Sequence, residues 1–295
     1  MYIMRAQGRY GNQFFQAIFC RYCELILKKT IKYDYPRLKW HFGNGYEPGK
    51  YLNLKIKKAT IPDKLFTLGV NGIELPPRFT KPGKWIEQYE KLKKENKVIV
   101  LHDHEDFITK ENFNYYIPKD NVMIDSYFFN HRYFFAIKDI IEDELVFKTP
   151  LDEKNSQLAS DMERSESVAV HIRQGDYKTL PDYDICGKDY YRMAIEYIRE
   201  KLNNPFFYVF SQSDVEEYMP ADCQYIFIDH NTGTDSHKDV QLMTHCHHMI
   251  IANSSFSYMA ALLNPFDDKI VVMPEMYTKE CPFTAAPPSW KRIPI

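Results

Sequence analysis

In the second half of the chain, short apolar runs alternate with segments whose apolar residues recur at helical spacing. The runs have the length of buried strands and lie at 167–172, 206–210, 225–228, 249–252 and 269–273. The segments between them predict helices at 188–202, 213–218, 237–247 and 255–263. This alternation is typical of a parallel, doubly wound α/β sheet. Because such sheets bind ligands at the carboxyl ends of their strands, we look for chemistry there.

The first half begins in the same way. Its pattern predicts strands at 2–6, 98–101 and 122–127, and helices at 13–28, 131–143 and 152–164. The stretch from 36 to 97 is aromatic and punctuated by Pro and Gly, and its pattern assigns no element. We expect two Rossmann-like lobes that divide near residue 160, an N-terminal lobe over 1–160 and a C-terminal lobe over 161–295.

Length and composition narrow the class of protein. The chain has 295 residues, of which 44% are apolar and 26% charged, enough to bury a core. No apolar run approaches the roughly 18 residues of a membrane-spanning helix, and the N-terminus lacks the pattern of a signal peptide. These features argue against a membrane protein, a secreted disulfide scaffold and a disordered chain. We expect a cytoplasmic enzyme or binding protein, with peripheral attachment at the inner face of a membrane left open.

The net charge of −2 is unevenly divided. Residues 1–160 carry a net charge of +6 and residues 161–295 a net charge of −8. The lysines of the first half favour a solvated face over a nucleic-acid surface, because no nucleic-acid-binding signature accompanies them. We therefore expect no nucleic-acid partner.

The cysteines and histidines raise the question of a metal site. Cys20 and Cys23 form a C-x-x-C inside a predicted helix, where a pair of reduced core thiols is favoured over a redox or zinc site. Residues 245–248 read His-Cys-His-His. Successive residues of a helix point in different directions, so at most two of these four could share one ion. We expect no bound metal.

Three loops at strand ends suit an anionic or sugar ligand. The first is Gly8-Arg-Tyr-Gly-Asn-Gln13, where two glycines permit a tight turn. The second, His171-Ile-Arg-Gln-Gly-Asp-Tyr177, brings an arginine fork to a strand end, with Asp176 as its partner or as a loop anchor. The third is Asn253-Ser-Ser-Phe256, where hydroxyls and backbone N–H groups begin a helix. Each also has an ordinary structural interpretation as a turn, a buried ion pair or a helix cap.

In order and spacing, these motifs resemble those of the bacterial α-1,2-fucosyltransferases of glycosyltransferase family 11. The matching segments are Gly8-Arg-Tyr-Gly-Asn-Gln-Phe-Phe-Gln16, His171 to Tyr177, Phe207-Tyr-Val-Phe-Ser211, and Asp239 to Ser257. The resemblance implies a GT-B architecture, with two Rossmann-like lobes and the active site in the cleft between them. It also implies inverting transfer of L-fucose from GDP-β-L-fucose to a hydroxyl of a glycan acceptor, without metal or cofactor. The expected acceptor is a terminal galactose, joined in an α-1,2 linkage. The donor belongs to the C-terminal lobe and the oligosaccharide acceptor to the N-terminal lobe.

The resemblance carries roles onto matching positions. Arg173 corresponds to the arginine that binds the β-phosphate and stabilises the departing GDP, and Asn12 to an asparagine facing the sugar. Asp176 is the nearest candidate for a base, although a structural role beside the arginine is favoured. The implied donor contacts are His171, Ser211, Asp239, Asn253, Ser254, Ser255 and Phe256.

The chain departs from the family pattern at several positions. Gln174 replaces the second arginine of R-R-G-D, and Tyr258-Met-Ala-Ala261 replaces W-W-G-A. Tyr127-Phe-Phe-Asn-His131 replaces Y-W-Q-S-E and so lacks its glutamate. Two alternatives follow: a fucosyltransferase of another linkage or acceptor, such as a protein O-fucosyltransferase, and a non-catalytic nucleotide- or glycan-binding protein on the same fold.

Overall fold

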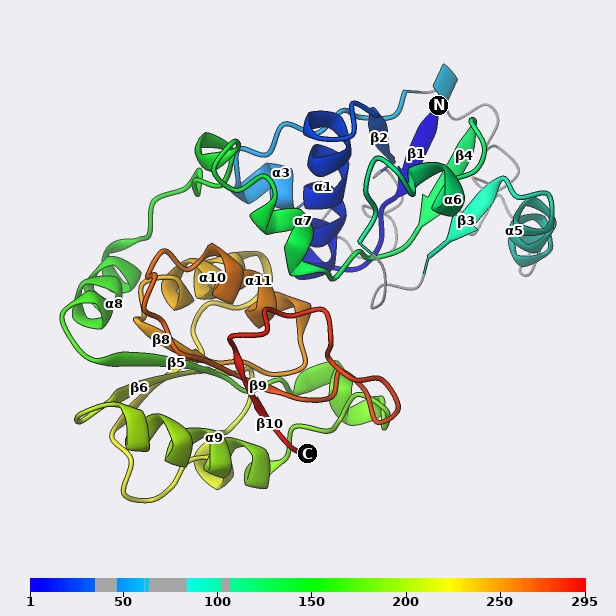
Figure 1. The fold of residues 1–295 in the computed structure, drawn as a ribbon. Coiled ribbons are helices and arrows are strands. Elements are labelled where there is room, and N and C mark those ends of the chain that lie inside the picture. The colour runs from blue at the N-terminus through cyan, green and yellow to red at the C-terminus, as the bar shows by residue number, and fades with distance from the viewer. Residues whose placement is uncertain (35–46, 61, 64–83, 102–106) are drawn as a thin grey trace. The chain divides into compact units, whose positions relative to one another are not determined.

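The structure, a computed structural model, describes residues 1–34, 47–60, 62–63, 84–101 and 107–295, without the side chains of 84–86, 88 and 176. Contacts divide the chain into two compact units, Met1–Lys148 and Thr149–Ile295. Each unit contains a parallel β-sheet, and each is described by itself (Figure 1).

The sheet of the first unit has four strands in the order β2-β1-β4-β3, all parallel. The strands are β1 (Tyr2–Arg5), β2 (Ile31–Asp34), β3 (Val98–Val100) and β4 (Val122–Asp125). Strands β1 and β4 are central and buried along their whole length. Their carboxyl ends therefore meet at one edge, beside that of β3.

Helix α1 (Tyr10–Leu25) follows β1 and is the main buried helix of this unit. Its aromatic side chains pack on those near α7 (His131–Phe135); the rings of Phe19 and Phe128 stack with their centroids 3.6 Å apart. The remaining helices are short or peripheral: α3 (Pro48–Tyr51), α5 (Lys84–Lys94), α6 (Phe113–Tyr116) and the 3-10 turn η3 (Glu142–Glu144). Most of the unit's core is thus built by one helix against one sheet.

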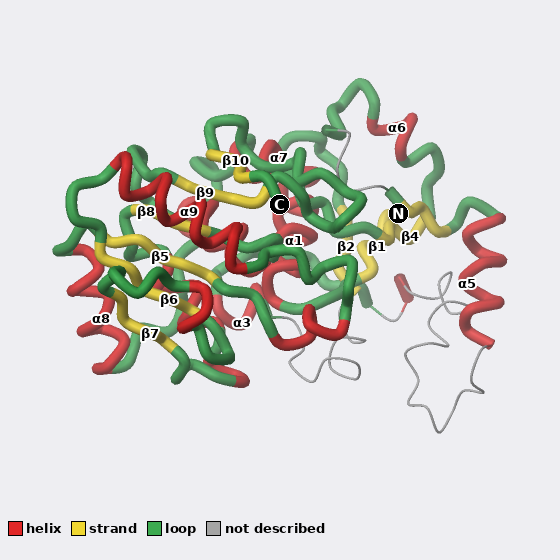
Figure 2. The backbone as a smooth tube through the Cα atoms, turned by 90° about the horizontal axis from the view of Figure 1, so that it is seen from below, coloured by secondary structure: helices red, strands yellow, loops and turns green. Residues whose placement is uncertain are grey.

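The second unit has a six-stranded parallel sheet in the order β10-β9-β8-β5-β6-β7. Its strands are β5 (Ser167–His171), β6 (Phe206–Phe210), β7 (Tyr225–Ile228), β8 (His248–Ile250), β9 (Val271–Pro274) and β10 (Lys291–Ile293). Helix α9 (Lys188–Lys201) covers one face, and α8 (Glu153–Glu163), α10 (His237–Met243) and α11 (Ser255–Leu263) lie on the other (Figures 1 and 2). Three 3-10 turns complete it: η4 (Gly175–Thr179), η5 (Glu216–Tyr218) and η6 (Gly233–Asp235).

The α/β fold class with two Rossmann-like units is confirmed. The boundary predicted near residue 160 is wrong, because α8 belongs to the second unit. The Asp152 carboxylate caps α8 and pairs with Lys238 of α10 at 2.9 Å. Asn155 donates to Asn231 at 3.0 Å, which ties α8 to the loop that leads to α10. These polar contacts hold α8 on the second sheet.

The predicted strands form within one or two residues of their expected ends, and the larger differences concern helices. The helix predicted over 131–143 stops at Phe135, and only Glu216–Tyr218 of the segment 213–218 is helical, as a 3-10 turn. The pattern did not predict β2 or β10. The stretch 36–97 that it left unassigned lies partly outside the described residues.

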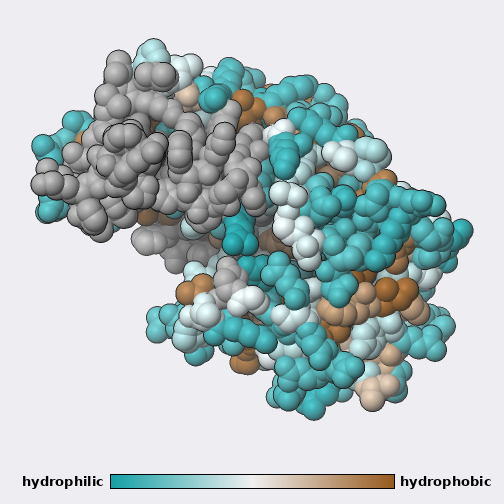
Figure 3. All heavy atoms as spheres, turned by 180° about the vertical axis from the view of Figure 1, so that it is seen from behind, coloured by the Kyte–Doolittle hydropathy of each residue, from teal (hydrophilic) through white to brown (hydrophobic). Residues whose placement is uncertain are grey.

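On the face shown in Figure 3, most of the coloured surface is hydrophilic and apolar patches are small. Within the described ranges, no helix has the length and apolar character needed to cross a membrane.

Candidate active site

His171, the last residue of β5, begins the strongest candidate site of the second unit. Its side chain is buried, and its Nδ1 has no hydrogen-bond partner among the described residues. Burial, with a smaller contribution from the nearby Arg173 charge, lowers the pKa of His171 to about 3. The imidazole is therefore neutral near pH 7, and its buried nitrogen is available to a ligand.

Arg173 follows the end of β5 and is only partly exposed. Its guanidinium carbon lies 4.9 Å from the centre of the Tyr177 ring, and the Tyr177 hydroxyl donates to the backbone oxygen of Asn253 at 3.2 Å. Tyr177 thus connects the arginine to the loop after β8. Asp176 lies within η4, and its side chain is outside the described part of the structure.

The loop after β8 is held by Asn253. The buried Asn253 amide donates to the backbone oxygens of Tyr183 and Tyr277 at 2.9 and 2.8 Å, and its Oδ1 accepts from Cys186 Sγ at 3.3 Å. The side chain predicted to contact the donor is thus engaged inside the protein. Its visible role is to anchor the turn from which α11 starts.

The other predicted residues of this loop begin α11. The Ser254 Oγ accepts from the Phe256 backbone N–H at 3.4 Å and caps the helix, while Ser255 and Phe256 are partly exposed. The Phe256 ring lies 5.6 Å from the His171 ring. Strand ends β5 and β8 therefore bring His171, Arg173, Tyr177 and the start of α11 together.

Ser211 lies at the end of a strand, and Asp239 lies in a helix. Ser211 follows β6, is buried, and accepts from the Ser213 backbone N–H at 3.4 Å. Asp239 lies in the first turn of α10 and accepts from Asn231 at 2.9 Å. Burial raises the pKa of Asp239 to about 7, although the Asn231 hydrogen bond opposes this shift. A carboxyl that titrates near neutrality is unusual and often marks a binding site.

In the first unit, the turn after β1 explains why its motif begins with glycine. Gly8 has φ +69°, a conformation that side chains rarely adopt. A Cβ added to Gly8 would lie 2.2 Å from Asn12 Nδ2, so the Asn12 side chain occupies the space that only glycine leaves. Asn12 is partly exposed in the first turn of α1.

Gln16 of the same motif has a structural role that the sequence did not reveal. The Gln16 side chain is 0% exposed and makes four hydrogen bonds. Its Nε2 donates to the backbone oxygens of Arg5 and Ser126, at 3.2 and 2.8 Å. Its Oε1 accepts from the Gln7 backbone N–H and the Tyr33 hydroxyl, at 3.1 and 2.8 Å. One fully satisfied amide thus joins the ends of β1 and β4.

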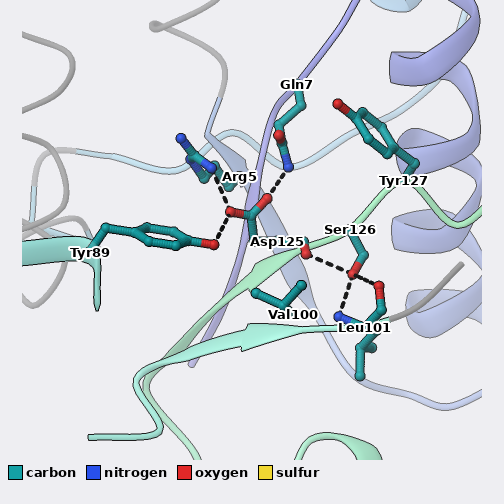
Figure 4. Close-up of a pocket in the computed structure, with 8 residues that line it drawn as sticks. All are labelled: Arg5, Gln7, Tyr89, Val100, Leu101, Asp125, Ser126 and Tyr127. Atoms are coloured by element: carbon teal, nitrogen blue, oxygen red, sulfur yellow. Dashed lines mark hydrogen bonds and ion pairs between the residues drawn. The ribbon is translucent and has the colours of Figure 1, made fainter. Parts of the chain in front are cut away.

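Beside this junction is a pocket that the motifs did not predict. It has a volume of about 370 Å³ and lies at the carboxyl ends of β1, β3 and β4 (Figure 4). Arg5, Gln7, Asp125 and Ser126 supply its polar groups, and Tyr89, Val100, Leu101 and Tyr127 complete its lining. The only sequence signal was polar residues at strand ends in Tyr-Ile-Met-Arg and Val-Met-Ile-Asp-Ser, which carry no known motif.

Asp125 is the centre of the pocket's polar network. Arg5 Nη1 donates to Asp125 Oδ2 at 2.5 Å, and the Tyr89 hydroxyl donates to the same oxygen at 2.6 Å. The Gln7 side-chain amide donates to Asp125 Oδ1. Figure 4 shows these three groups pointing at one carboxylate from different sides. Ion pairing here is internal, because Arg5 and Asp125 are both largely buried.

The cysteines and histidines singled out in the sequence have structural roles. Cys20 and Cys23 are buried thiols of α1, and burial raises the pKa of both. His245 contacts Glu163 at 2.7 Å and His248 contacts Glu166 at 3.1 Å, so the two rings have separate partners. Among the described side chains, no group of three or more His, Cys, Asp or Glu converges as a metal site.

Comparison with known proteins identifies the family. Residues 1–292 match the model of glycosyl transferase family 11. An alpha-1,2-colitosyltransferase of Escherichia coli is 29% identical over 309 aligned positions, which cover 99% of this chain and 98% of the relative. The O-antigen biosynthesis glycosyltransferase WbnK of Escherichia coli is 36% identical over 122 positions, covering 39% of this chain and 40% of WbnK.

Among solved structures, a variant of Arabidopsis thaliana FUT1 in complex with GDP aligns with a TM-score of 0.47 and 12% identity. The alignment covers 97% of this chain and 75% of that one. The family assignment itself rests on the model match along nearly the whole sequence. The chain belongs to glycosyltransferase family 11.

Proposed function

We propose that this glycosyltransferase transfers L-fucose from GDP-β-L-fucose to a hydroxyl of a glycan acceptor, with inversion at the anomeric carbon. The proposed product is an α-1,2 linkage, with terminal galactose as the first acceptor to test. The observation that supports the proposal most is the cluster of His171, Arg173 and the start of α11 at adjacent strand ends. In a family 11 chain, these are the positions whose motifs resemble the fucosyltransferase donor site.

The cluster has the chemistry needed for a sugar diphosphate. Arginine binds phosphate oxygens through a planar fork, and the partial positive charge at a helix N-terminus favours an anion. The Tyr177 ring beneath the Arg173 guanidinium limits where the fork points. The neutral His171 ring adds a nitrogen for hydrogen bonding without a second charge. Donor contacts from Ser211, Asp239, Ser254, Ser255 and Phe256 belong to the same proposal. The Asn253 side chain is engaged by protein groups, and its proposed part is to hold the loop that carries these residues.

The proposed reaction is an in-line displacement. A bond forms between the acceptor oxygen and the anomeric carbon, the bond from that carbon to the β-phosphate oxygen breaks, and GDP leaves with the bonding electrons. The acceptor hydroxyl loses its proton, for which Asp176 is the nearest candidate in the donor motif. Asn12 is proposed to face the sugar from the first unit. Arg173 and the first turn of α11 would stabilise the charge on the departing diphosphate, so the proposal requires no metal or cofactor.

The colitosyltransferase relative supports a second donor. Colitose is the 3-deoxy form of L-fucose, so the two donors differ by one hydroxyl. A site that hydrogen-bonds this hydroxyl would reject the deoxy sugar, whereas an apolar site would discriminate weakly. Parallel assays with GDP-fucose and GDP-colitose distinguish the two donors.

The Arg173→Ala substitution tests the donor site. Removing one preorganised group that stabilises a leaving charge typically slows turnover by about 10²–10³-fold. We expect a loss of this size in kcat for transfer from GDP-fucose, with the circular dichroism spectrum and the unfolding midpoint unchanged. Initial rates at saturating donor, measured by release of GDP, give the comparison.

Arg192→Ala is the matched control, because Arg192 is an exposed residue of α9 that pairs with Asp189 on the same helix. Its turnover is expected to match that of the unchanged chain. Near-normal turnover in the Arg173 variant would contradict the assignment. If the unchanged chain binds GDP but transfers no sugar to any acceptor, the non-catalytic alternative is favoured.

A further inference from the structure

We propose that the pocket of the first unit binds one neutral pyranose ring of the acceptor glycan. The proposal rests on the proposed glycosyl transfer but specifies a site and a ligand class within it. The pocket lies at the carboxyl edge of a parallel sheet, the usual ligand-binding edge of this fold class. Its volume of about 370 Å³ is at the small end of the roughly 300–1,000 Å³ range of ligand sites, which suits a sugar ring better than a nucleotide sugar.

The charges in the pocket favour a neutral ligand. Arg5 is paired with Asp125, and their side chains are only 10% and 7% exposed. The other polar groups of the lining, on Gln7, Tyr89, Ser126 and Tyr127, are uncharged near pH 7. An anionic ligand would meet the Asp125 carboxylate as well as the guanidinium. The excess positive charge of the first half of the sequence therefore does not extend into this pocket.

The remaining hydrogen-bonding capacity matches hydroxyl groups, which both donate and accept. A carboxylate can accept about four hydrogen bonds, and Asp125 accepts three from protein groups, which leaves one position on Oδ1. Gln7 uses its amide nitrogen on Asp125, and its carbonyl oxygen makes no hydrogen bond with the described residues. Among the described contacts, Arg5 donates through Nη1 alone, so other N–H groups of its guanidinium remain available. The network thus offers a ligand hydrogen-bond acceptors on Asp125 and Gln7 and donors on Arg5, and the protein's own contacts already hold these side chains in place.

The apolar part of the lining provides a surface for the C–H face of a sugar. Tyr89 and Tyr127 enter the pocket from α5 and from the segment after β4, and Val100 and Leu101 come from the end of β3 (Figure 4). Apolar and aromatic walls with a few fixed polar groups are the usual composition of a small-ligand site. Ser126 holds Leu101 in place, since its Oγ accepts from the Leu101 backbone N–H and donates to the Leu101 oxygen, both at 2.7 Å.

Val100→Trp tests the proposal, because Val100 is 40% exposed at the pocket and a larger side chain there occupies ligand space without replacing a core residue. The probe is methyl β-D-galactopyranoside. Its binding to the full chain, in the absence of donor, is measured by saturation-transfer NMR. We expect the signal from the unchanged chain to be lost in Val100→Trp. In transfer assays, the acceptor KM should rise about tenfold or more, while hydrolysis of GDP-fucose without acceptor stays unchanged.

Val146→Trp is the matched control, because Val146 is 55% exposed, belongs to the same unit and is not part of the pocket lining. It should bind the probe as the unchanged chain does, and unchanged unfolding midpoints in both variants establish that they fold. Equal binding by Val100→Trp and the unchanged chain would overturn the proposal. Displacement of the sugar by millimolar inorganic phosphate or by sialic acid would overturn its neutral-ligand part.

The NMR arm uses no nucleotide, so it separates this inference from the proposed function. Sugar binding that Val100→Trp abolishes, in a chain that does not transfer fucose, supports the pocket and counts against the donor assignment. Fucose transfer that Val100→Trp leaves unaffected supports the donor assignment and counts against the pocket. The Arg173→Ala variant should retain sugar binding in either case.

Discussion

At the scale of single residues, the structure separates side chains available to a ligand from side chains used inside the fold. His171 presents an unpartnered buried nitrogen, whereas the Asn253 amide is engaged by three protein groups. In the sequence, His171 and Asn253 look equivalent, because each belongs to a motif at the end of a predicted strand. Their difference follows from tertiary contacts with Tyr183, Cys186 and Tyr277, which are far from Asn253 in sequence.

Asp239 leads to a prediction about pH and stability. Its pKa is about 7 in the folded protein against 3.8 as the ordinary value, so the folded state keeps a proton that the unfolded state loses between these pH values. The free energy of unfolding contributed by Asp239 therefore falls as the pH rises from about 4 to 7. Asp239→Asn should gain stability relative to the unchanged chain across this range, by about 1 kcal/mol or more at pH 7.

The measurement is urea unfolding of both proteins at several pH values, with the difference taken at each. The difference cancels other titrations, including that of His171, whose lowered pKa makes stability rise with pH between about 3 and 6.5. Asp268→Asn, at an exposed aspartate, serves as the control. If the difference in the free energy of unfolding between Asp239→Asn and the unchanged chain does not depend on pH, the pKa of the Asp239 carboxyl is not raised.

At the scale of elements, the motif Gly8–Gln16 chiefly joins the ends of two strands. Gly8 makes room for Asn12, and Gln16 connects the ends of β1 and β4 at the edge of the pocket. The motif thus positions the lining of a pocket to which its own side chains contribute little. Its resemblance to the family pattern could indicate a site nearby, but not which side chains line it.

Gln16→Leu tests this role. The change removes one hydrogen bond from each of four protein groups: two backbone oxygens, one backbone N–H and the Tyr33 hydroxyl. We expect a loss of about 2–4 kcal/mol in the free energy of unfolding, measured by urea titration. Gln157→Leu, at an exposed glutamine of α8, should change it by less than about 0.5 kcal/mol. A Gln16 variant as stable as this control would contradict the role.

Elements with a strong local pattern were predictable, and elements that depend on tertiary contacts were not. The buried run Phe206–Phe210 and the helix Ser255–Leu263 were predicted with their observed bounds. Strand β10 (Lys291–Ile293) is short and carries two charged residues, so it forms only because it pairs with β9. Similarly, Asp152 and Asn155 fixed the unit boundary through contacts with Lys238 and Asn231 that no local pattern reveals.

At the scale of the whole molecule, the division of charge acquires a local interpretation. The half with net charge −8 carries the proposed site for an anionic donor, so Arg173 and the start of α11 must bind it through short-range contacts. The pocket proposed for the acceptor belongs to the half with net charge +6, yet its own charges cancel. Net charge by half of the sequence therefore does not predict the charge of either proposed site.

The most direct test of the central claim is transfer from GDP-β-L-fucose to a galactose-terminated oligosaccharide, with the product linkage determined by NMR. We predict a fucosylated product with an α-anomeric configuration on the galactose 2-hydroxyl, formed by the unchanged chain and by Arg192→Ala but not by Arg173→Ala. Transfer by Arg173→Ala at the normal rate, or a product with retained β configuration, would contradict it.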